Sequence, residues 1–147
     1  MTWIVVRVRG TIHSKHEISE TLQFLHLTRA NHATVVPETP SYRGMLSRVQ
    51  GYVTWGEADR ETVQMLVEQR GMTVTGTRFT ASPNAGALSV VADAVTRDGV
   101  VPAKELRPLF RLKAPRGGWR STKRAYGRGG ALGYRGPAIN ELVRRMV

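Results

Sequence analysis

The sequence predicts an α+β fold on a β-α-β-α-β core, and three features of the first 56 residues support that prediction. Residues 4–9 place apolar side chains at every second position, as a half-buried strand does. Two further strand-like segments, 32–36 and 52–55, are followed by Pro37 and Gly56, residue types that end strands. Between the three segments, apolar residues recur at helical spacing.

The two helices of this core have separate signals. Ile18 and Leu22 would lie on one side of the first helix. Thr39 followed by Pro40 predicts the start of the second, because threonine can cap the first turn and proline fits the first helical position. Since both helices of such a unit can cover one face of the sheet, we expect the other face to be open. Two basic residues of the first strand would point out of that face or lie at its edge: Arg7 and Arg9.

The remaining residues, 57–147, are expected to form an extension to a core domain of residues 1–56. Acidic residues just after Gly56 favour the start of a third helix, where the helix dipole stabilises negative charge. A Val-rich segment predicts a fourth helix over 88–95, and residues 109–112 are expected to form a strand.

The end of the extension combines a loop and a helix. High Gly and Arg content predicts an irregular, basic loop over about 113–136. A final helix is expected to begin at Pro137, and the residues on its apolar stripe are Ile139, Leu142, Val143 and Met146.

Positive charge is concentrated in the last third of the chain. The whole sequence holds 22 Lys+Arg against 11 Asp+Glu, a net charge of +11, and residues 100–147 account for 12 of the bases and 2 of the acids. No carboxylate occurs between Arg107 and Arg135, while Gly, Trp and Tyr are interspersed. An unneutralised basic segment favours a polyanionic partner. Nucleic acid is a better candidate than a membrane surface, because no long apolar face accompanies the charge.

Several function classes lack their sequence signals. Without cysteine there can be no disulfide, thiolate nucleophile or Cys-ligated metal site, and the four histidines form no metal-ligand pattern. Asp59 and Glu61 are better explained by a helix start than by acid–base catalysis. The glycines of 129–136 lack the Gly-Lys-Ser/Thr ending of a phosphate-binding loop. We therefore expect no enzyme activity, catalytic residue, metal, cofactor or small-molecule substrate. With no signal-peptide or membrane-helix pattern, we expect a cytoplasmic location.

The candidate RNA-binding residues follow from the chemistry of the partner. A basic stretch is ordinarily just a solvated surface, but this one lacks acids, contains aromatics and is Gly-rich. The expected phosphate contacts are Lys113, Arg116, Arg120, Lys123, Arg124, Arg128 and Arg135. The expected stacking residues are Trp119, Tyr126 and Tyr134. Glycines that would let the backbone approach RNA are Gly129, Gly130 and Gly133. A second contact region would contain Arg7, Arg9 and Arg43.

Several stretches resemble one family. The segments 29–32 (Arg-Ala-Asn-His), 39–46 (Thr-Pro-Ser-Tyr-Arg-Gly-Met-Leu), 52–56 (Tyr-Val-Thr-Trp-Gly) and 129–136 (Gly-Gly-Ala-Leu-Gly-Tyr-Arg-Gly) are similar to the large-subunit ribosomal protein L-thirty family in its archaeal form, whose eukaryotic counterpart is L-seven. The resemblance implies a β-α-β-α-β core, of ferredoxin-like type, on a three-stranded sheet. It also implies a structural role in the ribosome, with large-subunit ribosomal RNA and neighbouring ribosomal proteins as partners.

Two alternatives remain from the residues themselves. One is a free-standing RNA-binding or RNA-chaperone protein, which would not sediment with the large ribosomal subunit. The other is an enzyme acting on RNA, which would need acids, bases or metal ligands gathered in one cleft.

Overall fold

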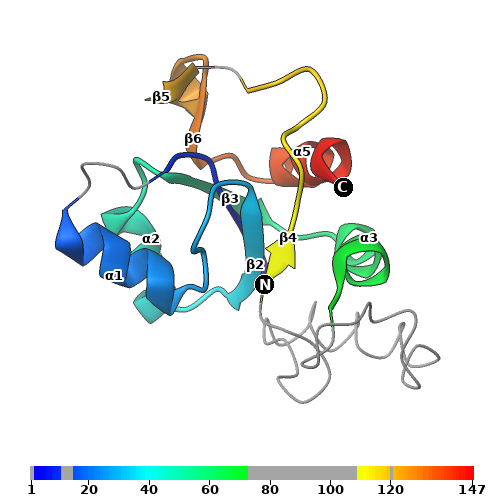
Figure 1. Ribbon diagram of the computed structural model, residues 1–147, viewed down its shortest axis with the longest axis horizontal. Coiled ribbons are helices and arrows are strands. Elements are labelled where there is room, and N and C mark those ends of the chain that lie inside the picture. The colour runs from blue at the N-terminus through cyan, green and yellow to red at the C-terminus, as the bar shows by residue number, and fades with distance from the viewer. Residues whose placement is uncertain (1, 11–14, 73–108, 120) are drawn as a thin grey trace.

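The computed structural model describes residues 2–10, 15–72, 109–119 and 121–147. The fourth helix expected over 88–95 lies outside these residues. The first half of the chain contains β1 (Thr2–Arg7), α1 (His16–Phe24), β2 (His32–Pro37), α2 (Pro40–Arg48) and β3 (Val53–Glu57). It is followed by α3 (Arg60–Arg70), β4 (Phe110–Arg111), β5 (Ser121–Ala125), the 3-10 turn η3 (Tyr126–Arg128), β6 (Gly130–Tyr134) and α5 (Ala138–Met146). The α+β class and the β-α-β-α-β order of the first half are confirmed (Figure 1).

The sheet has six strands in the order β4-β2-β1-β3-β6-β5, so the expectation of three strands is wrong. β1 pairs antiparallel with β2 and with β3, as in Ile4↔Val35 and Ile4↔Gly56. The extension supplies the other strands: β4 pairs antiparallel with β2, and β6 pairs in parallel with β3. The physical reason is that β2 and β3 would otherwise be edge strands with unpaired backbone groups, which the extension satisfies.

Helices cover both faces of the sheet, so the predicted open face does not exist (Figure 1). Trp3 and Val5 of β1 pack with buried residues of α1 and α2. Ile4 and Val6, which point the other way, pack with α3 and α5. Since both alternating sets of β1 are apolar up to Val6, each face needs a layer of helices to exclude water.

The predicted cap of the second helix and the predicted apolar stripe of the final helix are both found. The Thr39 side chain caps α2 by accepting a hydrogen bond from the backbone N–H of Tyr42 at 3.4 Å. The whole apolar stripe of α5 is buried against the sheet: Ile139, Leu142, Val143 and Met146. This layer contains residues of both halves of the chain. The division into a core domain of residues 1–56 and an extension stays a prediction, which truncation after residue 56 would test. Within the described part of the chain, no helix has the length and apolarity needed to span a membrane.

The expected irregular loop over 113–136 is wrong for much of its length, since it contains β5, η3 and β6. Sequence reasoning missed the partner that orders it, which is the free edge of β3. The Thr54 hydroxyl donates to the Gly133 carbonyl at 2.7 Å, and the Arg135 backbone N–H donates to the Trp55 carbonyl at 2.9 Å. These bonds continue the sheet into the Gly-rich segment.

Candidate nucleic-acid interface

Strand directions gather basic residues at one end of the sheet, which we call the basic end. β1 and β4 finish there, and β2, β3 and β6 begin there, as the pairs Arg7↔Val53 and His32↔Arg111 show. Its exposed cations on or beside these strand ends are Arg29, Arg48, Arg111 and Lys113, with Arg9 partly exposed. These residues are scattered over the sequence but meet because antiparallel pairing brings the start of one strand to the end of its neighbour.

Carboxylates lie at the opposite end of the sheet. Glu38 follows the last residue of β2, and Glu57 is the last residue of β3. Asp59 holds the N-cap position of α3, two residues further on. The separation of charge between the two ends gives the protein one face that attracts a polyanion and one that does not.

The segment after β4 is fastened to the C-terminal end of α5. The backbone N–H of Lys113 donates to the Met146 carbonyl at 3.0 Å, and that of Arg116 donates to the Arg145 carbonyl at 3.1 Å. The last carbonyls of a helix have no partner within it, so this segment satisfies them. As a result, the exposed side chains of Lys113, Arg116 and Arg145 belong to one surface.

The β5–β6 ribbon adds three exposed cations beside the basic end: Lys123, Arg124 and Arg128. Three of its glycines have structural reasons of their own. Gly129 ends η3 with φ +79°, in the left-handed region that favours glycine. A Cβ on Gly130 would overlap the Arg124 carbonyl oxygen, so the close backbone approach at this position is to β5. Gly133 has φ +83° with open space around it.

Arg7 does not point out of an open face. Only 3% of this residue is exposed, and its guanidinium donates to the carbonyls of Leu27 and Arg9, both at 2.8 Å. Burial lowers its pKa. The pKa of His32 is also lowered, first by burial and then by the positive charges of Arg111, Arg29 and Arg7. Arg7 is therefore a structural residue at the base of the basic end.

Arg9 and Arg43 do not form one contact region with Arg7. The Arg9 guanidinium carbon lies 5.4 Å from the centre of the Tyr52 ring, at the end of β1. The Arg43 guanidinium carbon lies 5.9 Å from the Trp3 ring, near the start of β1, and pairs with Glu38 at 3.5 Å. Residues 3 and 9 are separated by roughly 20 Å along a strand. The structure places Arg9, but not Arg43, at the basic end.

The three aromatic candidates have different surroundings. Trp119 is partly buried against the apolar core, and Tyr126 is 39% exposed with the Arg135 guanidinium carbon 4.8 Å from its ring centre. Tyr134 is 52% exposed at the opposite end of β6, where its hydroxyl donates to Glu57. That hydrogen bond raises the pKa of the Tyr134 hydroxyl.

Arg135 is held within the fold. Its Nε donates to the Thr54 hydroxyl and its Nη2 to the Ala131 carbonyl, both at 2.8 Å. Together with its place over the Tyr126 ring, these contacts fix the guanidinium along β6. Arg120 lies outside the described residues.

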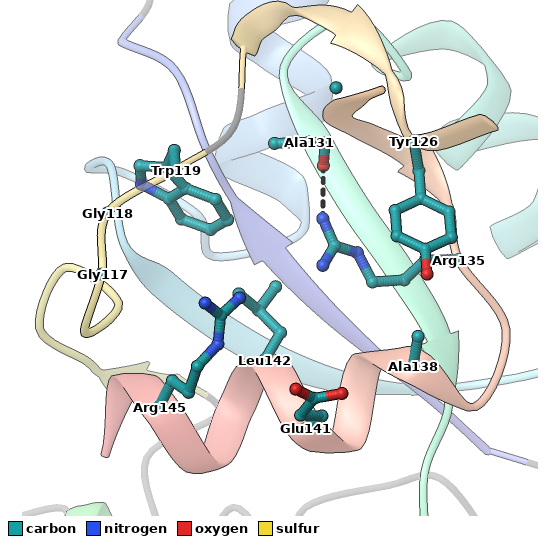
Figure 2. Close-up of a pocket in the computed structure, with 11 residues that line it drawn as sticks. Gly117, Gly118, Trp119, Tyr126, Ala131, Arg135, Ala138, Glu141, Leu142 and Arg145 are labelled. Atoms are coloured by element: carbon teal, nitrogen blue, oxygen red, sulfur yellow. Dashed lines mark hydrogen bonds between the residues drawn. The ribbon is translucent and has the colours of Figure 1, made fainter. Parts of the chain in front are cut away.

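A groove of about 320 Å³ opens between α5, β6 and the segment 117–119 (Figure 2). Trp119 lies on one side of it and Tyr126 with Arg135 on the other, while Glu141 and Arg145 project from α5. Sequence reasoning did not propose Glu141 or Arg145 as site residues, because the Arg145 charge is already explained by its favourable place in the last turn of the helix. Their spacing of four residues, on the side opposite the buried stripe, was the available signal.

Sequence reasoning also missed the cations Arg29, Arg48 and Arg111 at the basic end. Arg111 lies within a predicted strand, and Arg29 and Arg48 lie a few residues before one, so an antiparallel strand order would have placed them together. Across the described ranges, no three His, Asp or Glu residues come close enough to hold a metal ion.

Comparison with known proteins gives one consistent result. A family model described as ribosomal protein L30p/L7e matches residues 3–53. The chain is 42% identical to a protein of Methanosphaera stadtmanae over 99% of both chains, and 39% identical to one of Methanoculleus marisnigri over 98% of this chain and 99% of that protein. It is 42% identical to a protein of Korarchaeum cryptofilum, over 97% of this chain and 93% of that one. All three relatives are named large ribosomal subunit protein uL30.

Proposed function

The chain belongs to the ribosomal protein L30p/L7e family, and we propose that it is a structural constituent of the large ribosomal subunit that binds and stabilises ribosomal RNA. Its role is structural rather than enzymatic. Its partners are large-subunit ribosomal RNA and neighbouring ribosomal proteins. It is located in the ribosome.

The observation that carries the RNA-binding proposal is the gathering of cations at the basic end. Arg29, Arg48 and Arg111 come from the first half of the fold and from β4. Among the described residues of 113–128, the extension adds five further exposed cations: Lys113, Arg116, Lys123, Arg124 and Arg128. Phosphate contacts of this kind position a protein on RNA without reading sequence. The fold therefore presents a wide basic surface suited to a folded RNA.

The extension and the core share this surface. The fastening of Lys113 and Arg116 to the end of α5 holds their side chains beside the strand ends of β1 and β4. A preorganised set of cations loses less conformational entropy on binding than a free tail would. This favours a defined RNA-docking face over a loosely attached basic tail.

Filter binding of the isolated protein to a large-subunit ribosomal RNA transcript tests the proposal. If about six cations contact phosphates, affinity should fall on the order of a thousandfold between roughly 50 and 200 mM salt. A flat salt response would refute RNA binding through this surface.

Two matched variants locate the contact face. Lys123→Ala removes an exposed cation beside the basic end, and we expect it to reduce the slope of log affinity against log salt by about one. Arg43→Ala removes an exposed cation at the opposite end, beside Glu38, and we expect an unchanged slope. Equal effects of the two variants would show that the basic end is not the binding face.

A further inference from the structure

We propose that the groove between α5, β6 and residues 117–119 receives a single unpaired guanine base of the bound RNA (Figure 2). This inference rests on the proposed function, because it names what one part of the RNA-binding surface recognises. The volume of the groove, about 320 Å³, lies at the lower end of the range for small-ligand pockets, which is roughly 300 to 1000 Å³. The space suits one nucleotide and is too small for a helix of RNA.

The walls of the groove provide stacking surfaces. Trp119 borders one side, and its packing against the apolar core holds the indole ring in place. Arg135 borders the other side, fixed by hydrogen bonds to Thr54 and Ala131 and by the Tyr126 ring. Aromatic rings and arginine planes are the groups on which proteins stack unpaired RNA bases.

The helix side of the groove provides an acceptor. Glu141 lies on the exposed face of α5, and its carboxylate projects towards the groove (Figure 2). Among the described residues, it has no ion pair or hydrogen bond. An ionised carboxylate only accepts hydrogen bonds, and it offers two oxygens side by side.

Guanine is the base whose hydrogen-bonding edge fits that acceptor. Its N1–H and N2 amino group are neighbouring donors, so both carboxylate oxygens of Glu141 can be satisfied at once. Adenine and cytosine place an acceptor nitrogen beside their amino group, and uracil flanks its one N–H with two carbonyls. A carboxylate therefore favours guanine by attraction and disfavours the other three by repulsion.

A cation at the rim fits the phosphate of the same nucleotide. Arg145 lies one helical turn after Glu141, and its Nη1 donates to the Arg116 carbonyl at 3.3 Å, which holds the exposed side chain beside the groove. A phosphate at this rim would be continuous with the other contacts of the basic end.

The test uses hairpin RNAs that differ only in one bulged nucleotide: G, A, C, U or inosine. We expect the protein to bind the bulged-G hairpin about tenfold more tightly than the A, C and U hairpins. Inosine keeps N1–H and lacks the N2 amino group, so its affinity should be intermediate. Equal binding of all five hairpins with a steep salt dependence would overturn the guanine site and leave the proposed function standing. Weak, salt-independent binding of all five would overturn both.

Two variants and a second probe complete the test. Glu141→Gln should abolish the preference for G, whereas Glu68→Gln, which removes the same charge from an exposed position on α3, should preserve it. Trp119→Phe keeps an aromatic ring where alanine could unfold the chain, and it should retain the preference. Free guanosine monophosphate is titrated against the protein's tryptophan fluorescence. Saturation at micromolar concentration would assign the groove to a free nucleotide and overturn the RNA-base proposal.

Discussion

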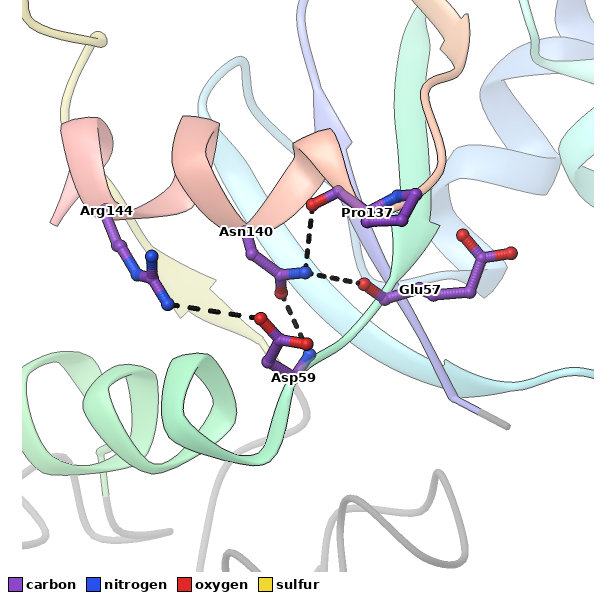
Figure 3. Close-up of polar contacts among 5 residues, drawn as sticks. All are labelled: Glu57, Asp59, Pro137, Asn140 and Arg144. Carbon is purple, nitrogen blue, oxygen red and sulfur yellow. Dashed lines mark hydrogen bonds and ion pairs between the residues drawn. The ribbon is translucent and has the colours of Figure 1, made fainter.

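Asn140 joins the final helix to the core, so its replacement tests whether the extension is an integral part of the fold. It is 4% exposed on the first turns of α5 (Figure 3). Its Nδ2 donates to the carbonyls of Glu57 and Pro137, both at 3.0 Å, and its Oδ1 accepts from the backbone N–H of Asp59 at 2.9 Å. Through these three bonds, one side chain fixes the start of α5 against the junction between β3 and α3.

The magnitude follows from those bonds. Each hydrogen bond within a protein stabilises it by about 1 kcal/mol net. After the substitution, the Pro137 carbonyl still accepts from the backbone N–H of residue 140, at 3.2 Å in the parent chain. Loss of the side-chain bond to this carbonyl therefore costs the least of the three. We expect Asn140→Ala to lower the free energy of unfolding by about 2–3 kcal/mol. In a chain of this size, that corresponds to a Tm lower by roughly 6–10 °C.

Urea denaturation followed by circular dichroism measures the change, with Gln69→Ala, an exposed position on α3, as the control. The control should stay within about 0.5 kcal/mol of the parent chain. Asn140→Asp keeps the oxygen that accepts from the Asp59 N–H but replaces the amide donor with a second carboxylate oxygen. It should be at least as destabilising as Asn140→Ala at pH 7. A loss below about 0.5 kcal/mol for Asn140→Ala would refute the claim that these bonds hold α5 in place.

Three further changes have defined outcomes. Gly130→Val should destabilise the β5–β6 ribbon, because its Cβ would overlap the Arg124 carbonyl; an unchanged Tm would contradict this. Tyr134→Ala should lower the Tm through loss of the bond to Glu57 and leave RNA affinity unchanged; a tenfold loss of affinity at unchanged Tm would instead establish base stacking. Burial lowers the folded-state pKa of His32, so the unfolded chain binds the proton more readily, and stability should fall as pH drops through about 6.5. His32→Gln should flatten this decrease, measured by denaturation at several pH values.

Part of the fold could be predicted because its signals are local. The strand at β1, the Thr39 cap and the apolar stripe of α5 each depend on residues close in sequence. Alternation in β1 did not predict its burial, because both faces of the strand are covered. The six-stranded sheet could not be predicted in the same way. The strand β6 forms because β3 offers a free edge, which is a property of the folded core rather than of the Gly-rich segment itself.

The candidate site was predictable by class but only partly by residue. A run of bases without acids predicts a basic surface, and the described cations of 113–128 that are exposed are Lys113, Arg116, Lys123, Arg124 and Arg128. The place of each side chain depends on its tertiary neighbours: Arg7 is buried and donates to the Leu27 carbonyl, and Arg43 pairs with Glu38. Arg29 and Arg111 join the surface only through the register of β2 with β4. Charge patterning along the sequence carries no information on that register.

Sedimentation on a sucrose gradient tests the central claim most directly. The protein is followed in a lysate of its source cells, before and after washing the ribosomes with moderate salt. We expect it to migrate with the large ribosomal subunit and to stay there through the wash, because many phosphate contacts must be broken together. Recovery of the protein at the top of the gradient, free of the large subunit, would contradict a structural role in that particle and favour a free-standing RNA-binding protein.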